Sequence, residues 1–215
     1  MEGNIILVDK PYRWTSFDVV KKLRYHLKVK KIGHAGTLDP LATGLLILCT
    51  NKMTKEISKY QDMEKEYVGK MIIGKTTPSF DLETAIDNIF EWRHVTPETV
   101  LRNAKLFEGK ISQIPPTYSA IKVQGKRAYT KARAGIDFKL KPRDVKISSF
   151  EITDIDLPEI SFRLVCSKGT YVRSIVRDFG NALGTGAYLA SLCRTRIGNF
   201  KIDSAKQLDE ICSLI

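Results

Sequence analysis

The chain lacks a long hydrophobic run. Its first apolar stretch, from Ile5 to Val8, is short, and Asp9 follows it directly. A signal peptide needs about 7–15 apolar residues in its core, and a membrane-spanning helix needs about 20. The start of the chain therefore predicts a buried strand, no membrane contact, and the cytoplasm as the location.

Cysteine and histidine are scarce and widely spaced. The four cysteines (49, 166, 193 and 212) form no CxxC pair, and the three histidines (26, 34 and 94) form neither HxH nor HxxxH. Zinc and redox sites in proteins usually show such spacings. The sequence therefore argues against a protein-bound metal. Cys49 and Cys166 each end an apolar run, which predicts buried free thiols.

Acidic residues are missing from one segment and rare in another. The formal net charge is +11, and residues 21–31 carry six basic and no acidic side chains. Residues 121–146, called the basic segment below, carry nine basic and two acidic side chains, while the remainder of the chain sums to −2. Such clustering favours a polyanion as ligand, although charge runs are also typical of solvated faces. Tyr25 and Tyr129 lie inside the two clusters and offer stacking surfaces for bases, which favours nucleic acid.

Apolar periodicity predicts several helices and strands, interspersed without a regular βαβ rhythm. This order favours a mixed sheet with helices packed on it. A helix capped by Thr15 or Ser16 follows the first strand, and Thr96-Pro97 starts another that Gly109 closes. The expected strands are 5–8, 45–49, 66–73, 119–123 and 160–166, and the other expected helices are 171–183 and one beginning after Ser204.

Residues 69–76 match the phosphate-loop pattern GxxxxGK[ST]. That pattern binds phosphates only where its glycines join a strand to the start of a helix. Here Lys-Met-Ile-Ile between the glycines favours a strand, and Pro78 opposes a helix beginning at Lys75. We therefore interpret the match as accidental.

The segment GHAGTLDPLATG, residues 33–44, is rich in small residues and carries Asp39 and His34. Glycines permit tight turns and close approach of a ligand. A carboxylate in such a loop can serve as a nucleophile, a metal ligand or a turn cap, and Asp-Pro pairs often cap turns. The spacing alone leaves these alternatives open.

The long motifs of the chain resemble those of the TruB family of pseudouridine synthases. The resemblance rests on this loop, on LVDKPYRWTSFDVV before it, and on KEYVGKMIIG (65–74), IPPTYSAIKVQGKRAYTKAR (114–133) and CSKGTYVRSIVRDFG (166–180). It implies an α+β pseudouridine synthase fold, with a mixed, largely antiparallel sheet flanked by helices and an RNA-binding cleft. It further implies conversion of uridine to pseudouridine in the T-loop of tRNA, at position 55, without a cofactor or metal.

The resemblance also implies roles for individual residues. Asp39 would be the nucleophile, with Arg173 as the cation that keeps it ionised. Tyr67 would stack on the base and assist loss of the C5 proton, and Tyr171 and Leu192 would line the uracil pocket. His34 would fill the space left when the nucleotide is flipped out. The basic segment would grip phosphates of the T-arm through Lys126, Arg127, Lys131, Arg133, Lys141 and Arg143.

Two features depart from the family pattern. Where many relatives have a TDTxDxxG-like loop, residues 77–85 read TPSFDLETA, which puts the contacts of that loop in doubt. The chain also ends at Ile215 without the C-terminal PUA-type domain of many relatives, so we expect residues 1–215 to form a single catalytic domain. We expect no obligate protein partner. Two alternatives are a non-catalytic tRNA-binding or tRNA-folding module, and a guide-dependent enzyme of ribosomal RNA.

Overall fold

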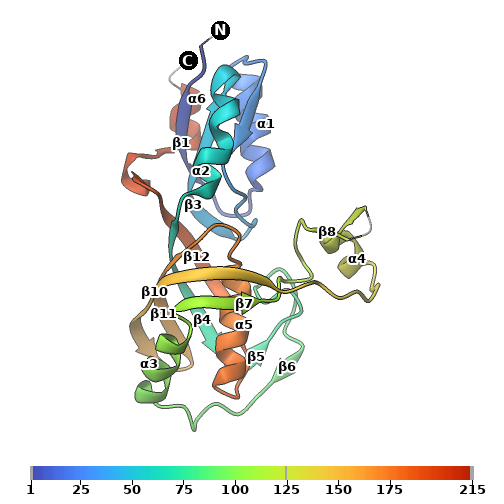
Figure 1. The fold of residues 1–215 in the computed structure, drawn as a ribbon, viewed down its shortest axis with the longest axis vertical. Helices are drawn as coiled ribbons and strands as arrows, with labels where there is room; N and C mark the ends of the chain where they lie inside the picture. The colour runs from blue at the N-terminus through green and yellow to red at the C-terminus, as the bar shows by residue number, and fades with distance from the viewer. Residues whose placement is uncertain (1, 124, 214–215) are drawn as a thin grey trace. The chain divides into compact units, whose positions relative to one another are not determined.

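The computed structural model describes residues 2–123 and 125–213, which divide into two compact units (Figure 1). Unit 1 consists of the chain up to Val68 and from Ser191 onward, and unit 2 consists of Gly69–Ala190. Strands β4 (Lys65–Ile73) and β12 (Ala187–Ile197) contribute residues to both units.

Unit 1 is a mixed sheet with helices on both faces. Its strand order is β14-β1-β3-β12-β4, in which β1 is antiparallel to β3 while β12 is parallel to β3. The other elements are β1 (Ile5–Lys10), α1 (Ser16–His26), β2 (Ile32–His34), β3 (Ala42–Thr50), a 3-10 helix (Asn51–Glu56), α2 (Ile57–Asp62), β13 (Phe200–Lys201), a 3-10 helix (Ile202–Ser204), β14 (Lys206–Gln207) and α6 (Leu208–Ser213).

Strand β3 explains the two layers of unit 1. Leu46 and Leu48 join a buried cluster with α1 and α6, whereas Leu45, Ile47 and Cys49 join a second cluster with Tyr60 of α2. Successive side chains of a strand point to opposite faces, so a strand covered on both faces is apolar throughout. This accounts for the uninterrupted apolar run in the sequence.

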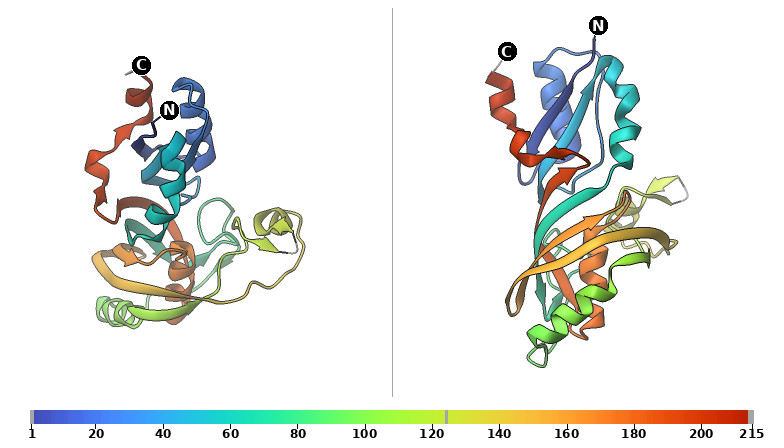
Figure 2. Two further views of the ribbon diagram at one scale, coloured as in Figure 1. Left: turned by 45° about the horizontal axis from the view of Figure 1, so that its top comes forward. Right: turned by 60° about the vertical axis from the view of Figure 1, so that its left-hand side comes forward.

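Unit 2 is a largely antiparallel sheet with helices packed on it (Figure 2). Its strand order is β12-β4-β11-β10-β7. Phe107, Phe150, Phe162 and Phe179 form a chain of ring contacts that joins α3 and α5 to β10 and β11. The remaining elements are β5 (Lys75–Thr76), β6 (Asn88–Ile89), α3 (Pro97–Leu106), β7 (Gly109–Gln113), β8 (Lys122–Val123), β9 (Lys126–Arg127), α4 (Ala128–Arg133), β10 (Arg143–Asp156), β11 (Glu159–Cys166) and α5 (Val172–Ala182).

The predicted α+β class is confirmed, as are the strands β1, β3, β4 and β11 and the helices α1, α3 and α5. Thr15 caps α1, because its side chain accepts a hydrogen bond from the Asp18 backbone N–H. The Asp18 carboxylate in turn accepts from the Thr15 backbone N–H, which completes a capping box. Cys49 and Cys166 are buried free thiols, as predicted.

The predicted strand over 119–123 is wrong for its first half, because β8 contains only Lys122 and Val123. Ser119 instead makes local turn bonds, its N–H donating to Thr117 O and its carbonyl accepting from Tyr129 N. The C-terminal helix begins at Leu208 and not directly after Ser204, since β14 intervenes. Helix α3 ends at Leu106 with Phe107 as its C-cap, and Gly109 already belongs to β7.

The structure confirms that the match of residues 69–76 to the phosphate-loop pattern is accidental. Its first five residues lie in β4, and the described residues 74–96 contain no helix. The helix N-terminus that a phosphate would need is therefore missing from this part of the described chain.

Candidate active site

Asp39 is half-buried on the loop that joins β2 to β3 in unit 1. Its carbonyl accepts a hydrogen bond from Ala42 N over 3.1 Å, which closes a turn. Gly44 ends this loop with φ +100, and a Cβ there would lie 2.4 Å from the carbonyl oxygen of Arg194. Glycine is therefore required at this position of β3, which pairs with Arg194 of β12.

Two anchors from the first strand and helix fix the tip of this loop. The Ser16 hydroxyl accepts a bond from Leu38 N over 2.9 Å, and its oxygen also lies 3.3 Å from the Leu38 carbonyl. The Pro40 carbonyl accepts from the backbone N–H of Arg13 over 2.9 Å and from Lys10 Nζ over 3.3 Å. The residues on both sides of Asp39 are thus tethered.

Arg194 of β12 holds the two ends of the loop. Its Nε donates to Leu45 O over 2.8 Å and its Nη2 donates to Gly36 O over 3.2 Å. The side chain is fully buried. A buried guanidinium with several fixed donors is well suited to hold backbone carbonyls in one arrangement.

Lys10 is buried beside this loop. Burial lowers the pKa of its ammonium to about 8, and the nearby carboxylate of Asp39 opposes that shift. Its Nζ also donates to the carbonyls of Pro11 and Trp14. Lys10 therefore places a cation close to Asp39 while it ties the loop to the end of β1.

His34 is half-buried at the end of β2. Burial lowers the pKa of its imidazole, and the positive charge of Arg194 lowers it further. Its Nδ1 is a buried atom without a hydrogen-bond partner in the described chain. A neutral imidazole fits the predicted role of a space-filling group better than a charged one, because burying a charge is costly.

Tyr67 and Leu192 lie on neighbouring strands of unit 1. Tyr67 is on β4 and Leu192 on β12, and each is 8% exposed. The two strands are joined nearby by Thr195, whose hydroxyl donates to the Glu66 carboxylate over 2.8 Å. Both side chains are therefore buried on adjacent strands, and their place in a uracil pocket stays a prediction.

Arg173 lies in the first turn of α5 in unit 2 and is 3% exposed. It donates to Ser79 O and to Tyr118 O, both over 3.0 Å, and its Nε lies 3.5 Å from the carboxylate of Asp81. Arg173 is therefore a buried side chain held within unit 2. The pairing of Arg173 with Asp39 stays a prediction, since the two residues belong to different units.

The loop that departs from the family pattern supplies Asp81. Within TPSFDLETA this residue stands where the pattern TDTxDxxG has its second aspartate. The loop is closed by side chains, because the Asp81 carbonyl accepts from the hydroxyls of Thr77 and Ser79 over 2.6 and 3.1 Å. The substitutions at the other pattern positions therefore leave an ordered loop with its carboxylate against Arg173.

Tyr171 precedes α5 and is clamped by Gln113 of β7. The Tyr171 backbone donates to Gln113 Oε1 over 2.8 Å and accepts from Gln113 Nε2 over 3.1 Å. Gln113 is fully buried. The guanidinium of Arg143 lies 5.2 Å from the centre of the Tyr171 ring, a cation–π contact.

Most of the predicted RNA-binding side chains are exposed. Lys126, Arg127, Arg133 and Lys141 lie on the surface, and Arg133 forms an ion pair of 2.6 Å with Glu83 of the 77–85 loop. Lys131 is buried, with its Nζ 6.0 Å from the centre of the Phe138 ring, which favours a packing role. Arg143 is half-buried against Tyr171 as described above.

Sequence reasoning missed Lys10, Ser16, Gln113, Arg194 and Asp81. Lys10 and Ser16 stand inside the motif LVDKPYRWTSFDVV, but the motif by itself does not show that either residue holds the Asp39 loop. Arg194 gave none. Residues 2–123 and 125–213 contain no group of three or more His, Cys, Asp or Glu side chains placed to hold a metal ion. They also contain no helix long and apolar enough to cross a membrane.

Comparison with known proteins shows the family of the chain. Residues 24–172 match the TruB family pseudouridylate synthase (N terminal domain). A protein of Flavobacterium johnsoniae named tRNA pseudouridine synthase B is 51% identical, over 95% of this chain and 93% of its own length. One of that name from Parabacteroides distasonis is 52% identical, over 97% of this chain and 92% of its own length.

Among solved structures, a chain of a Cbf5-Nop10-Gar1 complex superposes with a TM-score of 0.76 at 30% identity, covering 97% of this chain and 53% of its own. A chain of an H/ACA RNP bound to a substrate RNA containing 2′-deoxyuridine gives 0.73 at 28% identity, covering 97% and 52%. The present chain thus spans about half the length of these solved chains. The family match and the near full-length relatives define a pseudouridine synthase. The chain belongs to the TruB family of pseudouridylate synthases.

Proposed function

We propose that this enzyme converts uridine to pseudouridine in the T-loop of tRNA, at position 55. The observation that carries the proposal is the similarity to relatives named tRNA pseudouridine synthase B, which are 51% and 52% identical over nearly the whole chain. The loop that carries Asp39 lies inside the segment that matches the family. Its tethering by four buried or backbone donors supports a role that requires a fixed carboxylate.

The reaction is an isomerisation, so its atoms balance without a second substrate. The C1′–N1 bond breaks and a C1′–C5 bond forms, while C5 loses a proton and N1 gains one. Asp39 acts at the ribose, either by attack at C1′ or by removal of the 2′ proton, and both need the ionised carboxylate. No step requires a cofactor or a metal.

The other site residues then take supporting roles. Arg173 supplies positive charge, and Tyr67 stacks on the detached uracil and assists loss of the C5 proton. Tyr171 and Leu192 enclose the base and exclude water, which limits its escape. His34 fills the place of the nucleotide that leaves the stack, as base-flipping enzymes require.

The basic segment supports binding of the T-arm phosphates. Lys126, Arg127, Arg133 and Lys141 are exposed, and Arg143 joins the segment to Tyr171. Phosphate contacts fix the register of the RNA, and the shape of the T-loop selects the uridine. Lys131 contributes mainly by packing. One catalytic domain, a cytoplasmic location and independence from a partner protein are part of the same proposal.

Release of tritium from tRNA labelled at C5 of uridine tests the proposal. The wild-type chain should release tritium and form pseudouridine at the T-loop, whereas Asp39→Asn should abolish release and keep tRNA affinity. Full binding by a wild-type chain that releases no tritium would instead establish a non-catalytic tRNA-binding module. Modification at other sites only would overturn the assignment of the T-loop.

A further inference from the structure

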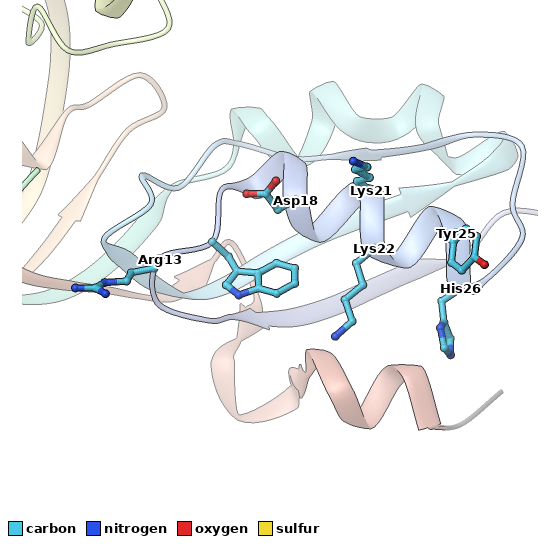
Figure 3. A pocket seen from close by; sticks show the side chains of 7 residues that line it. Arg13, Asp18, Lys21, Lys22, Tyr25 and His26 are labelled. Atoms are coloured by element: carbon cyan, nitrogen blue, oxygen red, sulfur yellow. The ribbon is translucent and has the colours of Figure 1, made fainter. Parts of the chain in front are cut away.

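A hollow of about 600 Å³ lies along α1 in unit 1, and the proposed chemistry does not use it (Figure 3). Below, the α1 surface means the side chains that line it: Arg13, Trp14, Asp18, Lys21, Lys22, Tyr25 and His26. Positions three, four and seven apart on a helix share a face, which explains why these side chains meet. Figure 3 shows Lys22 and His26 directed toward α6.

The floor of the hollow is built from packed and bonded groups. Trp14 packs against the core cluster of α1, β1 and α6, and Lys22 Nζ lies 5.4 Å from the centre of its ring. His26 Nε2 lies 2.6 Å from the carbonyl oxygen of Cys212. The floor is therefore held in place by contacts within unit 1.

The rim offers cations and an unusually exposed aromatic ring. Tyr25 is 86% exposed, and Arg13 and Lys21, which also line the hollow, are exposed. Residues 21–31 contain six basic and no acidic side chains. The Asp18 carboxylate is bonded to the Thr15 backbone and hydroxyl over 2.9 and 2.6 Å, so it serves the helix cap.

One end of this surface reaches the loop that carries Asp39. The backbone of Arg13 donates to Pro40 O, and Ser16 of α1 is bonded to Leu38. From there α1 runs to His26, which at 1.5 Å per residue is about 15 Å. A stacked strand has one phosphate per roughly 3.4 Å, so this length matches about four nucleotides.

We propose that the α1 surface is a track for the RNA strand that flanks the target uridine. Phosphates pair with Arg13 and Lys21, and a base stacks on Tyr25. The proposal rests on the proposed function and extends it by a second RNA contact. RNA fits better than a lipid surface, because the apolar face of α1 (Val19, Val20 and Leu23) is already buried in the core.

The carboxylate of Asp209 competes with RNA phosphates for Lys22 on the floor of the hollow. The Lys22 ammonium is paired with Asp209 of α6 over 2.6 Å, and the Asp209 side chain is 91% exposed. A carboxylate that neutralises a lysine on the floor opposes an incoming phosphate. Removing that carboxylate should therefore tighten RNA binding, which a merely structural pair would not do.

The experiment measures the affinity of the full chain for tRNA as a function of salt. Tyr25→Ala should weaken binding about fivefold or more, because stacking on an aromatic ring contributes at least that much per base. Tyr25→Phe should keep the affinity. Lys21→Gln should reduce the slope of log affinity against log salt by about 0.7, the loss of one phosphate contact on a single strand.

Matched variants make the result specific. Lys105→Gln on α3 removes the same charge from another exposed lysine and should change binding less than Lys21→Gln. Asp209→Asn should tighten binding. Failure of the proposed function is distinguishable from failure of the track, because it would show as absent turnover in the wild type with tRNA binding intact.

Two outcomes overturn the track. The first is wild-type tRNA affinity in both Tyr25→Ala and Lys21→Gln, with melting temperatures showing that both fold. The second is polyglutamate binding that depends on Lys21 and Tyr25 as strongly as tRNA binding does, which would indicate a surface for acidic protein segments.

Discussion

Asp81 lies 3.5 Å from the guanidinium of Arg173, and the two side chains are only 6% and 3% exposed. The guanidinium also donates to two backbone carbonyls, so its donors are directed by the loop that contains Asp81 and by the segment around Tyr118. Asp81 comes from the 77–85 loop, and Arg173 from the first turn of α5. The orientation of Arg173 therefore depends on that loop keeping its shape.

Asp81→Asn should lower both stability and turnover. Removing one partner of a buried ion pair leaves an uncompensated charge, which lowers the free energy of unfolding by about 3 kcal/mol. The Arg173–Asp81 separation of 3.5 Å is long for an ion pair, so we expect no larger loss. Urea unfolding and single-turnover tritium release would measure the two effects. Asp87→Asn removes an exposed carboxylate in the same unit and is the control. Wild-type turnover in folded Asp81→Asn would contradict the dependence of Arg173 on this loop.

The sequence predicted the elements whose periodicity is regular. Strand β4 buries every second residue from Lys65 to Ile73, and α1 has its cap at Thr15 and buries Val20 and Leu23, although Phe17 of the expected apolar stripe is exposed. Strand β10 was not predicted, because irregular register between Ile147 and Ser149 and between Ile152 and Asp154 breaks its alternation. Strand β12 was not predicted either, because Arg194 and Arg196 make its sequence look like a polar loop.

The supports of the candidate site could not be predicted for a related reason. Lys10, Gln113 and Arg194 are fully buried, although lysine, glutamine and arginine are mostly exposed in proteins. Each has a backbone partner that is distant in the sequence: Pro40 for Lys10, Tyr171 for Gln113 and Gly36 for Arg194. Only the fold brings these partners together. The motif identifies Asp39 from the sequence, but the contacts that hold its loop are visible only in the structure.

Arg194→Lys should slow the reaction without weakening tRNA binding. An ammonium cannot reproduce the fixed fork that reaches Leu45 O and Gly36 O together, so one end of the Asp39 loop loses its tether. A displacement of about 1 Å in a reacting group can reduce the rate about 100-fold. Single-turnover tritium release and tRNA affinity would separate chemistry from binding.

Arg196→Lys is the matched control for this variant, because Arg196 lies on the same strand and its side chain is 24% exposed. It should retain most of the activity. A loss of tRNA affinity in Arg194→Lys equal to its loss of rate would contradict a role limited to positioning Asp39.

Lys10 predicts a specific pH dependence of stability. Its pKa is about 8 in the folded protein against an ordinary value of 10.5, so between these values the unfolded chain holds a proton that the folded chain has released. Raising the pH through this window therefore favours the folded state. The stability of the wild type relative to Lys10→Met should rise from about pH 8 to pH 10.5, as measured by urea unfolding at several pH values.

Lys105→Met controls for the removal of an exposed lysine and should show a smaller change over the same window. A stability difference between wild type and Lys10→Met that falls with rising pH would reverse the predicted sign. It would mean that the carbonyl bonds and Asp39 outweigh burial at this ammonium.

Gln113→Leu tests the clamp on Tyr171. Leucine has a similar size but leaves the backbone N–H and carbonyl of Tyr171 without their partners, and each unsatisfied buried group costs about 1–3 kcal/mol. Gln207→Leu makes the same substitution at an exposed glutamine bonded to Asp9 and should change stability little. Because Tyr171 is the N-cap residue of α5, two residues before Arg173, a displaced backbone at 171 also shifts the start of α5. Turnover measured well below the melting temperature should therefore fall in Gln113→Leu and not in Gln207→Leu. Equal turnover in the two variants would show that Gln113 stabilises the fold without positioning the pocket.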